Sequence, residues 1–224
     1  MTARPDFPEI ETSAPVSAAI LVGGRARRMH GLDKSMLDVD GLPILERQLA
    51  VLRQLSDDLM IVTRAGAPDV GPALPPGRES PFAQPGLRIV SDEISDAGPL
   101  GGIHAALVNA RAPVTLVVAC DMPFLSLEFL RHLAARVEGV DVAVPRTTDG
   151  YHPLCAAYAQ TARPFVEQQL ARGEFKVSAL FSMDLRVAEL GPAELARFDP
   201  EGRMLSNVNT PHDYRQACSR TLDR

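Results

Sequence analysis

The sequence predicts an α/β fold with a mostly parallel sheet covered by helices on both faces. Short apolar runs alternate with helical patterns over residues 16–144, and turn residues directly follow several of those runs. Such alternation is typical of βαβ units joined by right-handed crossovers. The chain has 224 residues, of which 46% are hydrophobic and 5% aromatic. It is therefore long enough for one sizeable domain with an aliphatic core and short for two.

The first two thirds of the chain supply the expected core elements. Residues 16–22 read as a buried strand, and residues 43–55 have apolar side chains at helical spacing, with Pro43 in the first turn. Further strands are expected at 58–63, 87–91, 114–119 and 140–144, and helices at 98–109 and at 126–137, the latter with Ser126 as N-cap. Residues 71–86 hold five prolines and three glycines, which indicates a loop.

The last third is less regular. Strands are expected at 152–158, 185–190 and 205–209, and helices at 162–170, 176–181 and 211–218. Residues 1–15 contain three prolines and several charges, which indicates a flexible leader. No linker is evident after it, so residues 16–224 are expected to form a single domain.

Charge and cysteine content narrow the possible functions. The net charge is −5, yet four basic residues cluster in one loop: Arg25, Arg27, Arg28 and Lys34. A local basic cluster in an acidic protein favours a small anionic ligand over nucleic acid. The three cysteines form no C-x-x-C pair, which argues against a disulfide framework or structural zinc site. No signal peptide or membrane-spanning run is evident, so we expect a cytoplasmic protein with no membrane partner.

A glycine-rich basic loop follows the first predicted strand. Gly23 and Gly24 permit a tight turn and let phosphate oxygens approach backbone N–H groups. Arg28 and Lys34 would neutralise a triphosphate. The loop is neither a P-loop nor the dinucleotide G-x-G-x-x-G motif. Taken alone, it is equally typical of an ordinary basic surface loop.

Other polar or glycine-rich segments follow later predicted strands. Asp121 lies at the end of the most apolar run, where a carboxylate suits Mg²⁺, although an Asp ahead of a proline also simply forms turns. Residues 98–102 are typical of a turn at the start of a helix. They are equally typical of a segment whose glycines let a flat ligand, the base or ribose of a nucleotide, come close. Asp92 lies on the same edge. Because ligands bind beyond the carboxyl ends of strands in open α/β sheets, these segments predict a nucleotide and metal site.

Five segments together resemble the ordered motif set of the molybdenum cofactor guanylyltransferases. They are the L-V-G-G…R-M…K loop at 21–34, G-P-L-G-G at 98–102, C-D-M-P-F-L at 120–125, H-P-L…Y at 152–158 and N-V-N-T-P-H-D at 207–213. The resemblance covers about residues 18–214, and the second, fourth and fifth motifs are its more specific ones. The chain departs from the family at Val22, where alanine is usual, and at His30, where glycine is usual.

The resemblance implies a three-layer αβα Rossmann-like nucleotidyltransferase fold and transfer of GMP from GTP to molybdenum–molybdopterin, with Mg²⁺ as cofactor and pyrophosphate as product. Such a reaction needs in-line positioning and charge neutralisation rather than a strong base. The implied catalytic residues are Lys34, Asp121 and Arg28, with Asp121 also the metal ligand. The implied contacts to nucleotide or pterin come from Leu21, Val22, Gly23, Gly24, Lys34, Thr63, Asp92, Gly98, Pro99, Leu100, Asn207 and Asn209.

Some of these assignments are more specific. Leu21 to Gly23 would contact guanine and ribose, and Asn207 and Asn209 would hold the pterin. Thr63 stands near a position where the family often has an asparagine that contacts the nucleotide. His152, between apolar neighbours, is expected to be a positioned structural histidine. The implied partners are the two substrates and, transiently, other cofactor-biosynthesis proteins and molybdoenzymes.

Three alternatives stay open on the sequence alone. A transferase that uses CTP on the same cofactor is the nearest, and the Gly23-Gly24 pair and Gly98-Pro99-Leu100 favour GTP over it. A non-catalytic cofactor-binding protein would need neither Lys34 nor Asp121. A nucleotide-sugar pyrophosphorylase fits the basic loop, but the short chain and residues 207–211 count against it.

Overall fold

The computed structural model describes residues 14–23, 34–64, 80, 82–94 and 96–219, with Lys34 and Ser219 as backbone only. The described residues form an eight-stranded sheet in the order β10-β7-β9-β6-β1-β4-β5, with β8 paired to β7. The strands in chain order are β1 (Val16–Val22), β4 (Asp58–Arg64), β5 (Leu87–Asp92), β6 (Val114–Ala119), β7 (Val142–Thr147), β8 (Gly150–Tyr151), β9 (Cys155–Ala159) and β10 (Val187–Leu190). Strand β1 is parallel to β4 and β6, whereas β9 runs antiparallel between β6 and β7. The predicted mostly parallel sheet is confirmed.

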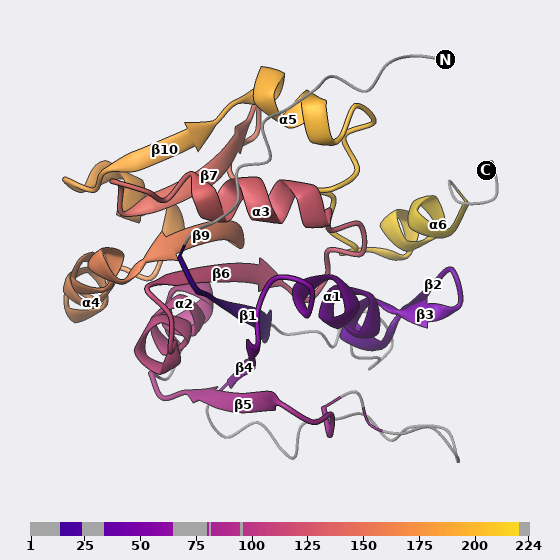
Figure 1. Cartoon of the computed structure of the whole chain (residues 1–224), viewed down its shortest axis with the longest axis horizontal. Coiled ribbons are helices and arrows are strands. Elements are labelled where there is room, and N and C mark those ends of the chain that lie inside the picture. Colours follow the sequence, from indigo (N-terminus) through magenta and orange to yellow (C-terminus); the bar gives the residue numbers. More distant parts are fainter. Residues whose placement is uncertain (1–13, 24–33, 65–79, 81, 95, 220–224) are drawn as a thin grey trace.

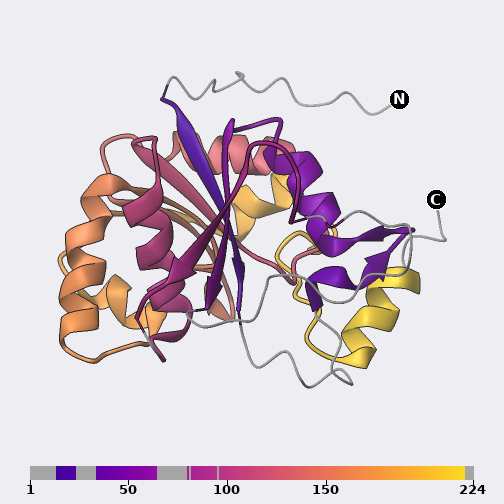
Figure 2. The same ribbon diagram turned by 90° about the horizontal axis from the view of Figure 1, so that it is seen from below.

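Helices cover both faces of this sheet, which gives the predicted three layers (Figures 1 and 2). Helices α2 (Gly98–Asn109) and α4 (Arg163–Ala171) lie on one face, and α1 (Ile44–Leu52), α3 (Leu127–Ala135) and α5 (Pro192–Phe198) on the other. Successive residues along a strand point to opposite faces of the sheet, so they pack in the core on the α2 side and the core on the α1 side in turn. In β1, Ala19 and Leu21 pack with the α2 layer, and Ala18 and Ile20 pack with the α1 layer. Short 3₁₀ helices are η2 (Lys34–Met36), η3 (Gln160–Ala162) and η4 (Val177–Ser182).

A small third core lies beside the main sheet. A hairpin of β2 (Asp38–Val39) and β3 (Leu42–Pro43) packs against α6 (Pro211–Ser219), at the right of Figure 1. Its buried residues come from segments far apart in the chain: Leu37, Val39, Ile44, Val208 and Ala217. The Tyr214 hydroxyl also donates a hydrogen bond to the Asp38 carbonyl at 2.7 Å. This core holds residues 207–210 close to the carboxyl ends of the central strands.

Several sequence expectations need correction here. Residues 205–209 do not form a strand, because the Val208 amide donates to the Asp121 carbonyl at 2.8 Å instead of joining a ladder. The β2–β3 hairpin and α5 were not predicted. The hairpin turns at Asp40 and Gly41, which have φ of 57° and 80°, the two positive values that favour an Asp-Gly turn. Helix α3 begins as expected, with the Ser126 hydroxyl accepting from the Phe129 amide at 3.3 Å.

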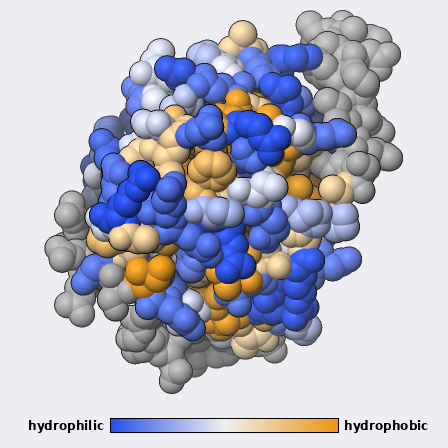
Figure 3. Space-filling view, turned by 90° about the vertical axis from the view of Figure 1, so that its left-hand side faces the viewer, coloured by the Kyte–Doolittle hydropathy of each residue, from blue (hydrophilic) through white to orange (hydrophobic). Residues whose placement is uncertain are grey.

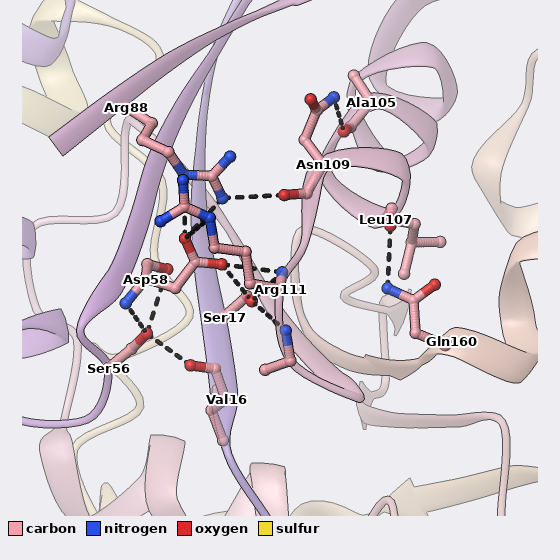
Figure 4. A network of polar contacts seen from close by, with 11 residues as sticks. Val16, Ser17, Ser56, Asp58, Arg88, Ala105, Leu107, Asn109, Arg111 and Gln160 are labelled. Atoms are coloured by element: carbon pink, nitrogen blue, oxygen red, sulfur yellow. Dashed lines mark hydrogen bonds and ion pairs between the residues drawn. The ribbon is translucent and has the colours of Figure 1, made fainter.

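Two carboxylates, the half-buried Asp58 and the buried Asp141, fasten the amino-terminal edge of the sheet. Asp58 at the start of β4 accepts hydrogen bonds from Ser17, Arg88 and the Arg111 amide (Figure 4). Asp141, just before β7, accepts from Arg186 through both guanidinium and amide groups. These bonds from Arg186, opposed by burial and helped by Thr161, lower the pKa of Asp141 to about 2. These ion pairs therefore stabilise the amino-terminal edge of the sheet, and the opposite edge, at the carboxyl ends of the parallel strands, is available for a functional site.

The face on the α4 side of the molecule is mostly hydrophilic, with hydrophobic residues in small patches (Figure 3). Among the described residues, no helix is long and apolar enough to cross a membrane.

Candidate active site

The candidate site lies where β1 and β6 end side by side. Leu21 pairs with Ala119 in the parallel register, and the Cys120 amide donates to the Leu21 carbonyl at 3.3 Å. Strands β1 and β6 therefore end next to each other at this edge of the sheet. Gly24 and Arg28 lie outside the described residues, and Lys34 opens η2 with only its backbone described. The roles expected of these three residues stay predictions.

The turn that carries Asp121 joins three of the sequence motifs. Asp121 is half-buried, and its carbonyl accepts from the Val208 amide at 2.8 Å. On the other side, the Ala119 amide donates to the Leu154 carbonyl at 2.8 Å. Motif segments 120–125, 152–158 and 207–213, separated by many residues in the chain, thus meet around one turn.

A pocket of about 260 Å³ opens beside this turn. It is lined by Pro99, Met122, Tyr151, His152, Pro153, Leu154, Cys155, Val177 and Asn207. Four of the five motif segments contribute to it, and the fifth is the glycine loop that is mostly outside the described residues. A largely apolar wall with a few polar groups is the usual lining of a small-molecule site.

The two predicted asparagines differ in position. Asn207 lines this pocket and also a neighbouring one of about 250 Å³ between the 123–124 turn and α6. Asn209 lies outside both pockets and is exposed. Its backbone amide donates to the Asp213 carboxylate at 2.9 Å. Asp213 also accepts from the Thr210 amide at 2.8 Å, which fixes the start of α6. Asn207 is therefore the better placed of the pair for a ligand.

His152 is held firmly at the pocket wall. Its Nε2 lies 2.9 Å from the Thr147 hydroxyl, and its amide donates to the Pro145 carbonyl at 2.9 Å. Burial lowers the pKa of His152, with Asp149 opposing the shift, so its imidazole is neutral at pH 7. These contacts fit the positioned histidine that the sequence predicted.

Three of the predicted nucleotide residues use their side chains inside the protein. The Leu21 side chain packs on Gly102, where an added Cβ would lie 3.1 Å from Cδ1. The Thr63 hydroxyl donates to the Val90 carbonyl at 3.4 Å. The Asp92 carboxylate is buried and accepts from the Ile94 amide at 3.0 Å. Any contact of Leu21 with a nucleotide would accordingly use its backbone.

Asp92 is closely packed against the first turn of α2. An added Cβ on Gly101 would clash with one Asp92 carboxylate oxygen, and would lie 2.8 Å from the other oxygen and 2.9 Å from the Ala97 Cβ. Burial raises the pKa of Asp92, while a hydrogen bond from Ile94 and the charges of His104 and Arg64 oppose it. Gly101 thus allows the N-terminus of α2, with Pro99 and Leu100, to approach the end of β5.

We expect Gly101→Ala to destabilise the fold by about 1–3 kcal/mol through overpacking on Asp92. Inside a helix, alanine is otherwise more favourable than glycine by about 1 kcal/mol. The sign of the change in unfolding free energy therefore shows whether the close packing outweighs helix propensity. Urea unfolding of the variant and wild type measures the difference. A variant as stable as wild type, or more stable, would show that the carboxylate moves away freely.

Sequence reasoning missed several residues at the site. Met122, Tyr151 and Val177 line the pocket, and Tyr151 stacks on Phe181 with ring centroids 4.4 Å apart. Tyr151 directly precedes the H-P-L motif and could have been found by extending it, whereas Val177 carries no local signal. Gln48 of α1, which donates to the carbonyls of Ala119 and Met122 on either side of Asp121, was also missed. Residues 44, 48 and 52 share one helix face whose outer two residues are apolar, so the pattern indicates only a core position.

Comparison with known proteins decides the family. Residues 18–186 match a family model described as a MobA-like NTP transferase domain. The chain belongs to this family. It is a nucleotidyltransferase, and the carboxyl edge of its sheet is where the family's motifs converge.

Relatives match over most of their length. A probable molybdenum cofactor guanylyltransferase from Methanosarcina mazei is 35% identical and covers 88% of this chain and 87% of its own. A molybdenum cofactor guanylyltransferase from Syntrophotalea carbinolica is 33% identical, with 88% of each chain covered. Among solved structures, the molybdopterin-guanine dinucleotide biosynthesis protein A of Archaeoglobus fulgidus superposes with a TM-score of 0.73 at 28% identity, covering 93% of this chain and 100% of its own.

Proposed function

We propose that this MobA-like NTP transferase transfers GMP from GTP to the phosphate of molybdenum–molybdopterin and releases pyrophosphate. The names of the relatives support the substrate pair. The observation that carries the proposal is the pocket of about 260 Å³ beside Asp121, to which Pro99, Met122, His152 and Asn207 come from four separate motifs. A pterin has flat ring faces and hydrogen-bonding edges, which suits a wall of apolar side chains with a few polar groups. The reaction would take place in the cytoplasm, with transient contacts to the proteins that supply and collect the cofactor.

The two substrates are assigned to neighbouring parts of one edge. GTP would lie over the ends of β1 and β6, with its phosphates on the glycine loop, Arg28 and Lys34. The α2 N-terminus, at Gly98 to Leu100, would approach the base or ribose. The pterin would occupy the pocket against Asn207, so its phosphate would reach the nucleotide near Asp121.

The residues present suit a magnesium ion. Within the described part of the chain, no group of three or more His, Cys, Asp or Glu side chains could hold a metal. Mg²⁺, however, commonly binds one or two carboxylates and completes its shell with waters and substrate phosphates. Asp121, half-buried on a fixed turn at the open edge, offers such a carboxylate. When bound, the ion would supply charge neutralisation at the α-phosphorus and the leaving pyrophosphate.

The chain's own groups would do the rest by position and charge. The incoming phosphate is already a nucleophile, so no residue is assigned a proton transfer. The backbone N–H groups of the glycine loop, with Lys34 and Arg28, would bind the phosphate oxygens and hold the two reactants in line. A neutral His152 at the pocket wall agrees with a role in shaping the acceptor site.

A labelled-nucleotide assay tests the proposal. We expect the purified chain, given molybdenum–molybdopterin and Mg²⁺, to incorporate label from GTP at least about 100-fold faster than from CTP, and EDTA to abolish incorporation. Use of CTP with GTP ignored would assign the chain to the cytidylyl relatives instead. Binding of the pterin without incorporation from either nucleotide would favour a carrier.

A further inference from the structure

A glutamine interrupts the buried face of α1. Ile44, Leu45, Leu49 and Leu52 are buried there as the helical spacing predicts, and Gln48 lies among them with 1% of its surface exposed. Burying a side-chain amide costs free energy unless hydrogen bonds compensate. An apolar residue of similar size would fill this place without that cost. The position of Gln48 therefore needs a specific explanation.

Gln48 uses both of its N–H donors on the turn that carries Asp121. Its Nε2 donates to the Ala119 carbonyl at 2.7 Å and to the Met122 carbonyl at 3.0 Å. These two carbonyls flank Cys120 and Asp121 on either side. Its Oε1 is buried and has no hydrogen-bond partner among the described residues, so the amide group is oriented by the turn.

The preceding residue reaches the same turn. Arg47 donates from Nε to the Pro123 carbonyl at 3.3 Å and from Nη1 to the Val39 carbonyl at 3.1 Å. The Asp121 carbonyl itself accepts from the Val208 amide. Two consecutive residues of α1 thus fix the backbone on both sides of Asp121, and the 207–209 segment fixes the middle.

We propose that Gln48, assisted by Arg47, is a positioning residue that holds the Asp121 carboxylate in the place where it receives the metal–triphosphate. This inference rests on the proposed function. A carboxylate on a fixed turn loses little entropy when it binds a cation, and partners that orient a metal ligand typically contribute 10–100-fold to metal affinity. Gln48 does not touch substrate and acts through Asp121.

The fold contains a matched control for this idea. Gln169 on α4 is also 1% exposed, and its Nε2 donates to the Glu174 carbonyl at 3.0 Å and the Lys176 carbonyl at 2.8 Å. Its Oε1 likewise has no partner among the described residues. Gln169 fixes a loop that carries no candidate metal ligand. Val177 follows that loop and lines the pterin pocket, so Gln169→Met can alter use of the acceptor but not of the metal.

The experiment compares Gln48→Met with Gln169→Met in the full chain. Each change keeps the side-chain volume and removes two hydrogen-bond donors. We expect both variants to lose similar stability in thermal unfolding. Only Gln48→Met should raise the Mg²⁺ concentration for half-maximal transfer, by about 10-fold, with little change in turnover at saturating Mg²⁺. The same shift should appear without catalysis, as weaker Mn²⁺ binding followed by electron paramagnetic resonance in the presence of a non-hydrolysable GTP analogue.

The outcomes separate this inference from the function it rests on. An active wild type with equal metal dependence in both variants would overturn the role of Gln48. A wild type that fails to use GTP at any Mg²⁺ concentration would overturn the proposed function instead. If Gln48→Met does not fold, Arg47→Met changes a side chain that is 27% exposed and should raise the Mg²⁺ requirement in the same direction. An unchanged requirement in that variant would equally reject the inference.

Discussion

Asp121→Asn is expected to lower nucleotidyl transfer by about 1,000-fold while the protein stays folded. The substitution keeps the shape of the side chain and removes the charge that would bind the cation. The backbone of the turn is held by hydrogen bonds from Gln48 and from the Val208 amide, which the substitution leaves in place. Turnover with GTP at saturating Mg²⁺ measures the effect, and thermal unfolding confirms the fold.

Asp184→Asn is the matched control for this variant. Asp184 is exposed between η4 and β10, and its replacement changes the net charge by the same amount. We expect its turnover to equal that of wild type. If Asp121→Asn also kept full turnover, the metal role of Asp121 would be excluded, whereas equal losses in both variants would point to overall charge instead.

The central sheet could be predicted because its strands carry their own signal. Residues 114–119 and 16–22 are nearly continuous apolar runs, as expected of strands buried on both faces, and both form strands within one residue of the prediction. Residues 205–209 (L-S-N-V-N) hold only two apolar residues, and tertiary contacts determine their conformation. The Val208 amide donates to the Asp121 carbonyl, and the Val208 side chain packs in the third core. The local sequence pattern does not determine which acceptor will receive the hydrogen bond of a backbone amide.

The candidate site could be predicted only in part, for a related reason. Each motif follows a strand end, and the rule that parallel strands share a carboxyl edge is enough to bring Asp121 near Gly98 and Gly23. The supporting contacts come from other layers. Gln48 is at a core position of a helix and Val177 lies in a 3₁₀ turn, and neither residue type indicates a site. Residues that hold a site in place are thus visible only when the layers are assembled.

The amino-terminal edge of the sheet carries the second large effect. Asp58→Ala is expected to lower the free energy of unfolding by about 3 kcal/mol or more at pH 7. The Asp58 side chain is 12% exposed and accepts from Ser17 at 2.6 Å, Arg88 at 2.6 Å and the Arg111 amide at 3.0 Å (Figure 4). Its removal would take an acceptor from donors in β1, at the start of β5 and just before β6, and would leave Arg88 with the Asn109 carbonyl and the Arg111 amide with the Ser17 hydroxyl. Urea unfolding measures the loss.

The exposed pair of Arg163 and Glu167 provides the comparison. Both side chains are 42% exposed, so Glu167→Ala, with the same change of charge, should change stability far less than Asp58→Ala does. A similar loss in both variants would mean that the Asp58 network contributes no more than a surface ion pair.

The pH dependence of stability tests the same network from the other side. Burial raises the pKa of Asp58, but the hydrogen bonds from Ser17, the Arg111 amide and Arg88 together lower it more, so the pKa lies below its ordinary value. A carboxyl whose pKa is lowered by folding stabilises the fold above its unfolded pKa and loses that contribution as the pH falls through the folded value. The difference between wild type and Asp58→Ala should therefore be full at pH 7 and shrink below about pH 4. Asp141, with a pKa of about 2, should keep stabilising wild type and variant alike until the pH falls further. A stability difference between wild type and Asp58→Ala that stayed constant down to pH 2 would therefore show that packing, not charge, gives Asp58 its effect.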